Sequence, residues 1–430
     1  MGKIKNILKK IIPAWIFSIY HYKLALLGAL IYRFPSRQIK VVGVTGTKGK
    51  SSTTELVSAI LEEAGYKTAL VSTVRFKVGG ESRPNLKKMT MPGRFFLQKM
   101  LREAVDKRCD YFVLEMSSEG TKQFRHKFIS LDALLVTNLS PEHIESHGSY
   151  ENYKKAKFKI AGALEKSWKK NKVLVTNGDD PELAAFRQIN VATKIETHLA
   201  EVAPHALLVD GLFFTYDGEK FQTKLAGEFN LYNILLAIAY AKSQDIETAV
   251  VKRAIEKFPG VPGRLEQIVP ADPTLARLQD FKVIVDYAHT ADSLQKVYEV
   301  YQDHKIIAVL GGTGGGRDKG KRPVMGGLAD KYASFVYITD EDTYDEDPRE
   351  IAEQVAAGVT NAPKEIEMDR RVAIRKAIEK ATPEAVVIIT GKGTDPYIMR
   401  ANGAKEPWSD ANIAREELEK IMRRKSESKE

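Results

Sequence analysis

Apolar and polar positions divide the chain into two series of short apolar runs, each alternating with stretches of helical periodicity. The runs contain Val, Ile and Leu in succession, which is typical of strands buried on both faces of a parallel sheet. Helices are predicted where apolar residues recur at every third or fourth position. In the first series the predicted strands are 40–44, 69–72, 111–115, 133–137 and 172–176, with a helix over 51–64. This alternation predicts an α/β fold with a largely parallel sheet.

The second series begins near residue 283 and predicts a separate doubly wound, Rossmann-like unit. Its predicted strands are 283–286, 306–310, 335–339 and 385–390, and its predicted helices are 291–302, 321–331, 348–358 and 369–381. A Pro/Gly cluster, FPGVPG at 258–263, separates the two series and is typical of a linker. We therefore expect domains over 41–260 and 261–430, with a charged helical tail from residue 414.

Residues 1–40 are predicted to form a basic, apolar and helical N-terminal segment. Apolar residues of 3–12 share one helical face, and 11–32 is mostly apolar apart from Pro13, His21 and Lys23. The ten Leu, Ile and Phe residues of 11–32 contribute about −3 to −6 kcal/mol to insertion, whereas a central Lys costs about 2.5–3.5 kcal/mol, so the balance does not decide whether the segment spans a membrane. Two hypotheses stay open: a helix packed on the body of the protein, and a helix lying on the inner membrane surface through residues 1–36.

The formal net charge is +10, but the excess is confined to the beginning of the chain. Residues 1–54 contain ten Lys and Arg and no Asp or Glu, which leaves 56 basic and 56 acidic residues in the other 376. An even balance over the body gives no support for a nucleic-acid partner. The single cysteine, Cys109, excludes an internal disulfide framework and a zinc site with several thiolates. It also fits a reducing compartment, and we expect a cytoplasmic monomer.

The strongest motif is GVTGTKGKSSTT at 43–54, placed between a predicted buried strand and a helix. Gly46 and Gly49 let backbone N–H groups close around phosphate, Lys50 supplies a positive charge, and Ser51 or Ser52 offers a hydroxyl for Mg²⁺. It departs from the strict P-loop pattern, whose first glycine would fall on Val44. The alternative is a glycine-rich turn with an incidental lysine, which the strand–loop–helix context disfavours.

Two further segments of the first series carry candidate ligands. Glu115, in LEMSSEG at 114–120, ends a predicted strand and could hold Mg²⁺ beside the P-loop, or be a solvated strand-end acid. His143 and His147 are four residues apart, but Glu145 is not adjacent to the first histidine and no third zinc ligand is evident. Composition does not distinguish Lys157 from its neighbouring lysines, which would ordinarily form a solvated helix face.

The second series contains a glycine-rich loop, GGTGGGRDKGKRP at 311–323, directly after a predicted strand. Its backbone could approach a ligand closely and Arg317 could neutralise a transferring phosphate, although a flexible loop is the alternative. DYAHT at 286–290 ends another strand of the same unit. Because ligands of doubly wound sheets bind at carboxyl strand ends, both loops are expected on one face.

Taken together, these segments resemble the Mur ligase family, and most closely the branch that adds the third amino acid of the peptidoglycan stem peptide. The resemblance extends from about residue 41 to 410 and rests on nine segments in order. They are GTKGKS, SSEGTKQFR, TNLSPEH, YKKAK, GEFNLYN, GRLE, DYAHTADSL, GRDKGKRP and GKGTD. It implies an ATP-dependent ligase that joins an amino acid, expected to be a diamino acid, to a UDP-N-acetylmuramoyl peptide through an acyl phosphate.

The resemblance also implies roles for individual residues. ATP would contact the P-loop residues Gly46, Thr47, Lys48, Gly49, Lys50, Ser51 and Ser52, together with Asn233 (or Asn230), His289 and Arg317. Two Mg²⁺ ions would be held by Ser51, Glu115, His143 and a carbamylated Lys157, and Lys50, Glu115, His143 and Lys157 would be catalytic. The peptide and the amino acid would contact Thr90, Ser118, Gln123, Arg125, Asp342, Tyr344, Gly391 and Asp395. Arg317 would reach the phosphates when the domains close.

The chain departs from the family pattern in several places. Only about 40 residues precede the P-loop, where the family has a further domain for the uridine nucleotide. The family's SSH is SSE here, its GKGHE is GKGTD, and Tyr344 replaces the arginine that reads diaminopimelate. Six carboxylates within 340–347 could favour a cationic side chain such as lysine, or could simply be a solvated loop.

Three other hypotheses remain open. A folylpolyglutamate synthetase-like ligase would share the fold and the early P-loop, although DYAHTADSL and GRDKGKRP favour muropeptide ligases. A Mur-like ligase acting on a lipid-linked precursor would suit the basic N-terminus, but such proteins carry a four-cysteine zinc ribbon and this chain has one cysteine. A nucleotide-binding scaffold without catalysis is disfavoured by the intact Lys50, Glu115, His143 and Lys157.

Overall fold

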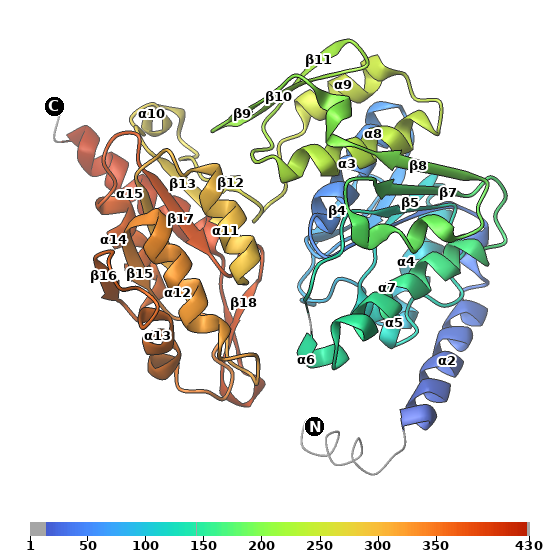
Figure 1. Ribbon diagram of the computed structural model, residues 1–430, viewed down its shortest axis with the longest axis horizontal. Coiled ribbons are helices and arrows are strands. Elements are labelled where there is room, and N and C mark those ends of the chain that lie inside the picture. The colour runs from blue at the N-terminus through green and yellow to red at the C-terminus, as the bar shows by residue number, and fades with distance from the viewer. Residues whose placement is uncertain (1–13, 143, 428–430) are drawn as a thin grey trace. The chain divides into compact units, whose positions relative to one another are not determined.

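The computed structural model describes residues 14–142 and 144–427, and the chain divides into two compact units. Unit 1 comprises the chain up to Leu207 with Leu212–Lys224 and Glu228–Phe258. Unit 2 comprises Leu208–Gly211, Leu225–Gly227 and Pro259–Glu430. Each unit has its own large sheet (Figure 1), and each is described by itself.

Unit 1 is built on an eight-stranded sheet of order β4-β3-β2-β5-β1-β6-β7-β8. Its strands are β1 (Lys40–Thr45), β2 (Thr68–Val71), β3 (Arg75–Val78), β4 (Glu81–Pro84), β5 (Tyr111–Glu115), β6 (Ala133–Val136), β7 (Val173–Asn177) and β8 (Thr193–Thr197). Six strands pair in parallel, and the hairpin β3–β4 continues the sheet antiparallel to β2. Strands β1, β2, β5, β6 and β7 lie centrally in the sheet and are buried almost throughout, which explains their unalternated apolar sequences.

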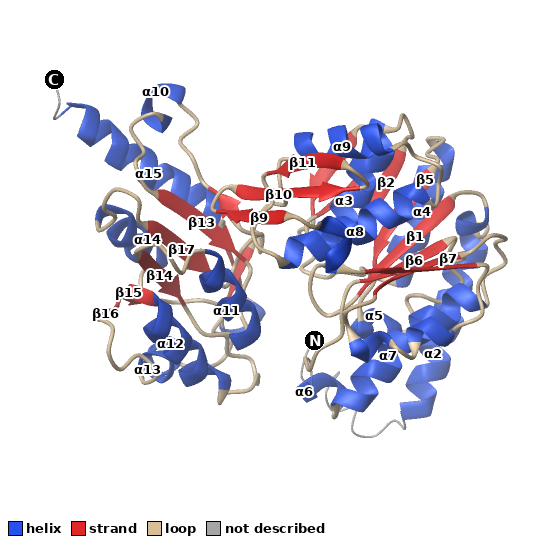
Figure 2. Cartoon of the chain, turned by 45° about the horizontal axis from the view of Figure 1, so that its top comes forward, coloured by secondary structure: helices blue, strands red, loops and turns tan. Residues whose placement is uncertain are grey.

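Helices cover both faces of this sheet (Figure 2). They are α2 (Ala14–Ile31), α3 (Lys50–Glu63), α4 (Arg94–Asp106), α5 (Ser118–Lys122), α6 (Ile144–His147), α7 (Tyr150–Glu165), α8 (Phe229–Lys242) and α9 (Thr248–Lys257). Apolar residues of α4 and α7 share one core cluster with the inner strands. Helices α3 and α8 pack against each other and against other residues of the same strands. A separate antiparallel sheet contains β9 (His205–Leu208), β10 (Gly211–Tyr216) and β11 (Glu219–Thr223).

Unit 2 is a doubly wound sheet of order β12-β13-β17-β14-β15-β16. Its strands are β12 (Glu266–Gln267), β13 (Lys282–Asp286), β14 (Ile306–Leu310), β15 (Ala333–Ile338), β16 (Lys364–Ile366) and β17 (Val386–Thr390), and only β12 is antiparallel. Its helices are α10 (Pro273–Ala276), α11 (Ala291–Val300), α12 (Lys321–Tyr332), α13 (Pro348–Ala356), α14 (Arg370–Glu379) and α15 (Asp410–Glu427). One core cluster contains α14 and α15, and the other contains α11, α12 and α13, so both faces are covered. A two-stranded ribbon, β18 (Tyr397–Met399) with β19 (Lys405–Pro407), completes the unit.

The predicted α/β class is confirmed, and each of the nine predicted strands is present within two residues of its predicted ends. The helix predicted within 11–32 is α2, and it packs on α4. The helical face predicted for 3–12 lies outside the described residues. None of the helices in the described part of the chain is long and apolar enough to span a bilayer.

Candidate functional site

The turn between β1 and α3 adopts a conformation that requires glycine at two positions. Gly46 has φ +148°, and a Cβ there would lie 1.8 Å from Thr137 Oγ1. Gly49 has φ +79°, and a Cβ there would lie 2.2 Å from Asn233 Oδ1. Side chains are rare at such φ values and could not fit in the space available. The tight turn predicted from GTKGKS is therefore built into the backbone.

The same turn presents the N-terminus of α3 together with two lysines. Gly49 occupies the N-cap position of α3 and has no side chain that would compete with a phosphate for the first N–H groups. Thr47 and Lys48 donate their backbone N–H groups to Asn138 O and Oδ1, both at 2.9 Å, which fixes the loop. Lys50 Nζ donates to Thr47 O at 2.7 Å and so curls back over the loop. Helix dipole and lysine charge together suit a bound phosphate group.

A pair of oxygen ligands lies beside this turn at the carboxyl end of β5. Ser51 Oγ donates to Glu115 Oε2 at 3.1 Å, and both residues are buried. Thr73 orients the carboxylate by donating its N–H to Oε2 at 2.6 Å and its hydroxyl to Oε1 at 2.9 Å. Hydroxyl and carboxylate oxygens are the donors that Mg²⁺ prefers, so Ser51 and Glu115 fit the ion that a P-loop implies.

Lys157 is buried against the P-loop, with only 2% of its surface exposed. Its Nζ donates to Gly46 O at 2.5 Å. Desolvation by burial, reinforced by the positive charge of Lys50, holds the pKa of Lys157 well below its ordinary value. Lys155 and Lys159 on the same helix are exposed. Burial therefore distinguishes Lys157 from the neighbouring lysines of the same helix.

Three residues near the loop were missed in the sequence analysis. Glu142 Oε1 lies 2.6 Å from Lys48 Nζ. The Tyr153 hydroxyl lies 2.9 Å from Thr47 Oγ1. Thr73, which orients Glu115, follows β2 closely at the same edge of the sheet. Its position after a predicted strand was the indication that could have identified it.

His143, the expected second metal ligand, lies outside the described residues. His147 Nε2 lies 3.2 Å from Ser118 Oγ and 3.1 Å from Glu119 Oε1, so this histidine orients the SSE segment. Burial is the main reason that the pKa of His147 is lowered. Within 14–142 and 144–427, no group of three His, Cys, Asp or Glu side chains is arranged to hold a metal ion.

The residues expected to contact the peptide lie together next to Glu115. Thr90 Oγ1 is 2.8 Å from Thr73 Oγ1, which links it to the Glu115 carboxylate. Arg125 Nη2 donates to Gln123 Oε1 at 2.8 Å, and Nη1 donates to the carbonyl of Met91, the residue after Thr90. Ser118 begins α5, directly after β5. The structure thus brings Thr90, Ser118, Gln123 and Arg125 to one edge of the unit 1 sheet.

The asparagines expected on the adenine side lie on α8. Asn233 Oδ1 accepts a hydrogen bond from Thr53 Oγ1 at 3.3 Å, and Asn233 Nδ2 donates to Asn230 Oδ1 at 2.9 Å. Both asparagines are buried. Because the Asn233 carboxamide also faces Gly49, α8 supports the P-loop directly.

In unit 2 the expected residues occupy loops at carboxyl strand ends. His289 Nδ1 lies 2.8 Å from Tyr287 O, and the two rings are 4.7 Å apart. A Cβ on Gly393 would lie 2.8 Å from Tyr287 Cβ, so GKGTD contacts DYAHT. The Arg317 guanidinium lies 5.9 Å from the centre of the Tyr344 ring. The structure therefore places the GKGTD loop beside the DYAHT loop, and Arg317 beside Tyr344.

The carboxylates of 340–347 are largely used within the protein. Asp342 Oδ1 is 2.6 Å from Lys392 Nζ, which is also 3.4 Å from Asp395. Asp340 forms an ion pair with Arg400, and Glu346 one of 2.9 Å with Arg322. Asp347 caps α13 by accepting from the Glu350 N–H. Internal cations thus offset much of this charge, which weakens the argument that the run attracts a cationic substrate.

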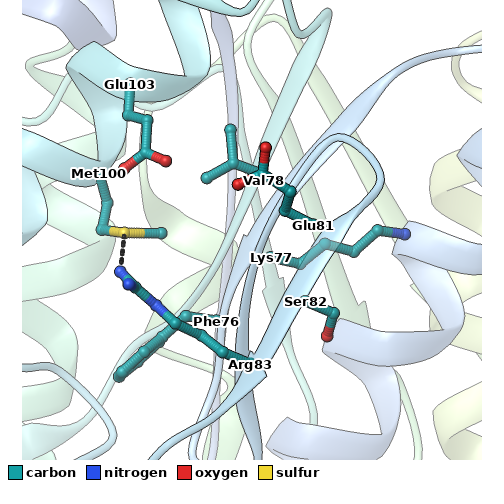
Figure 3. Close-up of a pocket in the computed structure, with 8 residues that line it drawn as sticks. All are labelled: Phe76, Lys77, Val78, Glu81, Ser82, Arg83, Met100 and Glu103. Atoms are coloured by element: carbon teal, nitrogen blue, oxygen red, sulfur yellow. Dashed lines mark hydrogen bonds between the residues drawn. The ribbon is translucent and has the colours of Figure 1, made fainter.

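A pocket of about 160 Å³ lies between the hairpin β3–β4 and α4, away from these residues (Figure 3). Arg83 extends across it, with Nη2 3.7 Å from Met100 Sδ. Strands β2 and β5 separate this hairpin from β1. No expected site residue lines the pocket, so it is not a candidate for the nucleotide or peptide site.

Comparison with known proteins agrees with this arrangement. Residues 44–241 match the Mur ligase middle domain, and residues 263–393 match the Mur ligase glutamate ligase domain. The UDP-N-acetylmuramoyl-L-alanyl-D-glutamate--2,6-diaminopimelate ligase of Syntrophomonas wolfei subsp. wolfei is 34% identical over 413 residues, covering 92% of this chain and 81% of that protein. The UDP-N-acetylmuramyl-tripeptide synthetase of Roseiflexus sp. is 32% identical over 429 residues, covering 93% of this chain and 82% of that protein.

A solved structure gives the same result. The structure of a UDP-N-acetylmuramoyl-L-alanyl-D-glutamate--2,6-diaminopimelate ligase superposes with a TM-score of 0.61 at 27% identity, covering 89% of this chain and 79% of that one. The structural similarity therefore extends over most of the chain. The chain belongs to the Mur ligase family.

Proposed function

We propose that this protein is an ATP-dependent amide ligase of peptidoglycan precursor synthesis. It would join a diamino acid to UDP-N-acetylmuramoyl-L-alanyl-D-glutamate, the acceptor in the names of its relatives. The observation that carries the proposal is the P-loop with the Ser51–Glu115 pair and the buried Lys157 on either side of it. Such a site suits transfer of a phosphoryl group to a carboxylate, after which an amine displaces the phosphate.

The residues of the loop would supply electrostatic stabilisation. A carboxylate becomes an acyl donor only when one of its oxygens has taken the terminal phosphoryl group of ATP, with ADP as the leaving group. The α3 N-terminus and Lys50 would hold the phosphate oxygens and offset the charge that spreads over them. Attack by the amino group of the incoming amino acid then forms the amide bond, releasing phosphate and one proton.

Ser51 and Glu115 would hold a Mg²⁺ ion, which supplies charge neutralisation between the phosphates when bound. Thr73 would keep the Glu115 carboxylate in place, because its two hydrogen bonds leave room for a further ligand on the oxygens. Thr90 is hydrogen-bonded to Thr73, so a peptide that contacts Thr90 would be held in register with the same carboxylate. Metal and acceptor would thus be aligned by one short chain of hydroxyl groups.

We further propose that Lys157 is carbamylated. Burial that lowers the pKa of Lys157 favours its unprotonated amine, and an unprotonated amine adds to CO₂ with loss of one proton to give an anionic carbamate. Lys50, whose charge disfavours the ammonium form of Lys157, would stabilise the carbamate. Carbamate oxygens could ligate a second Mg²⁺ with His143, which an ammonium group cannot do.

The proposed amino-acid substrate, a diamino acid, is inferred from the names of the relatives and not from the acidic residues of 340–347. Two of the relatives named above add 2,6-diaminopimelate by name, whereas Tyr344 stands where the resemblance places an arginine. Because the carboxylates of 340–347 are largely paired with internal cations, their charge does not select lysine over diaminopimelate. Tyr344 lies next to Gly315 and Arg317. It is therefore the position at which this chain would differ from its relatives in the choice of amino acid.

The test is ligation by the full chain with ATP, Mg²⁺ and the UDP-linked dipeptide. The amino acid is varied among meso-diaminopimelate, L-lysine, L-ornithine and L-glutamate, and the product is identified by mass spectrometry. We expect phosphate and tripeptide product in equal amounts with a diamino acid and neither with glutamate. Product with none of the four, while the protein still binds Mg·ADP, would refute the proposed substrate. Glutamate addition to a folate would instead indicate the folylpolyglutamate-type alternative.

A further inference from the structure

Helix α2 has its large apolar side chains on the outside. The residues that it buries are small, namely Ala25, Gly28 and Ala29. Its outward face carries six large apolar side chains that are 40–57% exposed. They are Ile16, Ile19, Tyr20, Leu27, Leu30 and Ile31, here called the α2 stripe. The spacing of three, four and seven residues places them on one side of the helix, which reverses the arrangement usual for a surface helix.

The stripe cannot turn inward without undoing the packing of α2 on α4. A Cβ on Gly28 would lie 3.6 Å from Phe95 Cδ1, so the two helices are in close contact there. Arg102 of α4 donates to Tyr32 O at 3.2 Å, just beyond the end of α2. The Tyr22 ring meets the edge of Phe128 at 5.2 Å. The small residues of α2 therefore pack on the protein, while the six large residues of the α2 stripe face outward.

The charged residues of segment 1–40 are all basic. Residues 1–40 contain eight Lys and Arg and no Asp or Glu, whereas the chain beyond residue 54 has a balanced charge. Lys23 lies within the stripe, and Arg33 and Arg37 are exposed just after α2. Long basic side chains can extend from an apolar surface towards anionic headgroups while their methylene groups stay buried. An anionic surface with an apolar layer beneath it is the complement of this segment.

We propose that α2 docks this protein on the surface of an anionic lipid bilayer. The α2 stripe enters the boundary between headgroups and acyl chains with the helix lying in the plane of the membrane, and the basic residues contact the headgroups. The described helices include none that could span a bilayer, and α2 is held along α4, which agrees with a helix that lies on the surface. From residue 16 to residue 31 the stripe is about 23 Å long.

The opposite side of α2 is close to the residues proposed to bind the peptide. Arg94 of α4 donates to Gln123 O at 2.7 Å and also contacts His21 of α2. Tyr22 meets the edge of Phe124, next to Gln123, at 6.2 Å. If the proposed function holds, α2 on a bilayer would bring the peptide acceptor close to the membrane surface. Lipid binding itself does not depend on that function.

Vesicle flotation of the full chain tests the proposal. Vesicles of equal phosphatidylcholine and phosphatidylglycerol are compared with phosphatidylcholine alone at about 0.1 M salt. We expect at least about tenfold stronger partitioning onto the anionic vesicles. The double variant L27E/L30E should lose at least about tenfold in partitioning, because two carboxylates would enter the apolar layer.

A matched control adds the same charge elsewhere. Leu208 and Val269 of unit 2 are comparably exposed, so L208E/V269E should partition within about twofold of the parent chain. Ligation of the soluble UDP-linked dipeptide should be equal in all three proteins, which separates a failure of docking from a failure of the proposed function. Absence of binding by the parent chain, or equal binding by L27E/L30E, overturns the proposal. A lipid-free dimer that L27E/L30E dissociates, without vesicle binding, would assign the stripe to a second copy of the chain.

Discussion

Lys157 acquires its chemistry from its position rather than from its sequence neighbourhood. The helix α7 carries several lysines, and their composition alone predicts a solvated face. The structure buries Lys157 on Gly46 O and leaves Lys155 exposed. Helical periodicity could have indicated this, since Tyr153, Lys157 and Ile160 lie on one side of α7 and all are buried.

The Lys157 proposal makes a direct prediction. K157A should lower kcat on the order of 100-fold or more, because removal of even an outer contact of a metal ligand costs 10–100-fold. The Kd for Mg·ADP, measured by calorimetry, should change little because Lys50 and Ser51 remain. K155A on the same helix is the control and should retain activity. A small carboxylic acid that restored turnover to K157A would support a carbamate at this position, whereas near-normal kcat in K157A would refute the role.

His126 is a second buried group whose charge state the fold controls. It is 2% exposed, and neither ring nitrogen has a hydrogen-bond partner among the described residues. Burial, with Lys127 and Lys159 nearby, lowers the pKa of His126 to about 3. The unfolded chain binds a proton at His126 below about pH 6.5, whereas the folded chain does so only near the lowered pKa.

His126 should therefore make stability depend on pH. Between about pH 6.5 and the lowered pKa, it should reduce the free energy of unfolding by up to about 1.4 kcal/mol for each unit of falling pH, and it should contribute no slope above that window. H126L lacks this contribution, so urea unfolding should show a smaller loss of stability on acidification than in the parent chain. Identical slopes for the two proteins between pH 6.5 and 4.5 would show that His126 is protonated in the fold.

At the scale of elements, the buried strands were predicted from the sequence and several exposed strands were missed. The central strands have unalternated apolar sequences because both of their faces are covered, and they were predicted almost to the residue. The hairpin strand β4 (Glu81–Pro84) is exposed at all four positions, so no apolar pattern marks it. The strands β8 and β9 are mostly exposed as well. These exposed strands pair because the chain brings them next to another strand, and the pattern of apolar residues does not show this.

The positions of site residues followed the same rule. Glu115 and the P-loop were predicted from their places after buried strands, and the structure puts them 3.1 Å apart at Ser51. The acidic run was misjudged because its partners, Arg322, Lys392 and Arg400, come from distant segments. Counting charged residues along the sequence gives the local net charge. It does not show which ion pairs form when distant segments meet in the folded protein.

Helices α14 and α15 are joined by a buried ion pair at their N-termini. Arg370 donates to Asp410 Oδ1 and Oδ2 at 2.8 and 2.7 Å, and both side chains are almost fully buried. D410A should cost about 3–5 kcal/mol in the free energy of unfolding of unit 2, since the guanidinium would stay buried without its partner. Glu379 pairs with Arg424 between the same helices but is exposed, so E379A should cost less than about 1 kcal/mol. Equal losses in denaturant unfolding would contradict this assignment.

At the scale of the whole molecule, each of the two units has a core of its own. Unit 1 has a core formed by its own sheet with α4 and α7, and unit 2 has two clusters on either side of its own sheet. The chain passes between the units at several points, and the last of these falls in the Pro/Gly-rich linker within 258–263. Separate cores joined by such a linker are typical of domains that can unfold one at a time.

Calorimetry should therefore resolve two thermal transitions, one for each unit. Mg·ADP binds the P-loop in our proposal, so at about 100 times its Kd it should add about 2.7 kcal/mol to the stability of unit 1 and raise that transition. D410A should lower the other transition, because the Arg370–Asp410 pair lies wholly within unit 2. The two perturbations should thus act on different peaks. A single peak that both shift would mean that the units unfold together, with the nucleotide and the ion pair stabilising one cooperative structure.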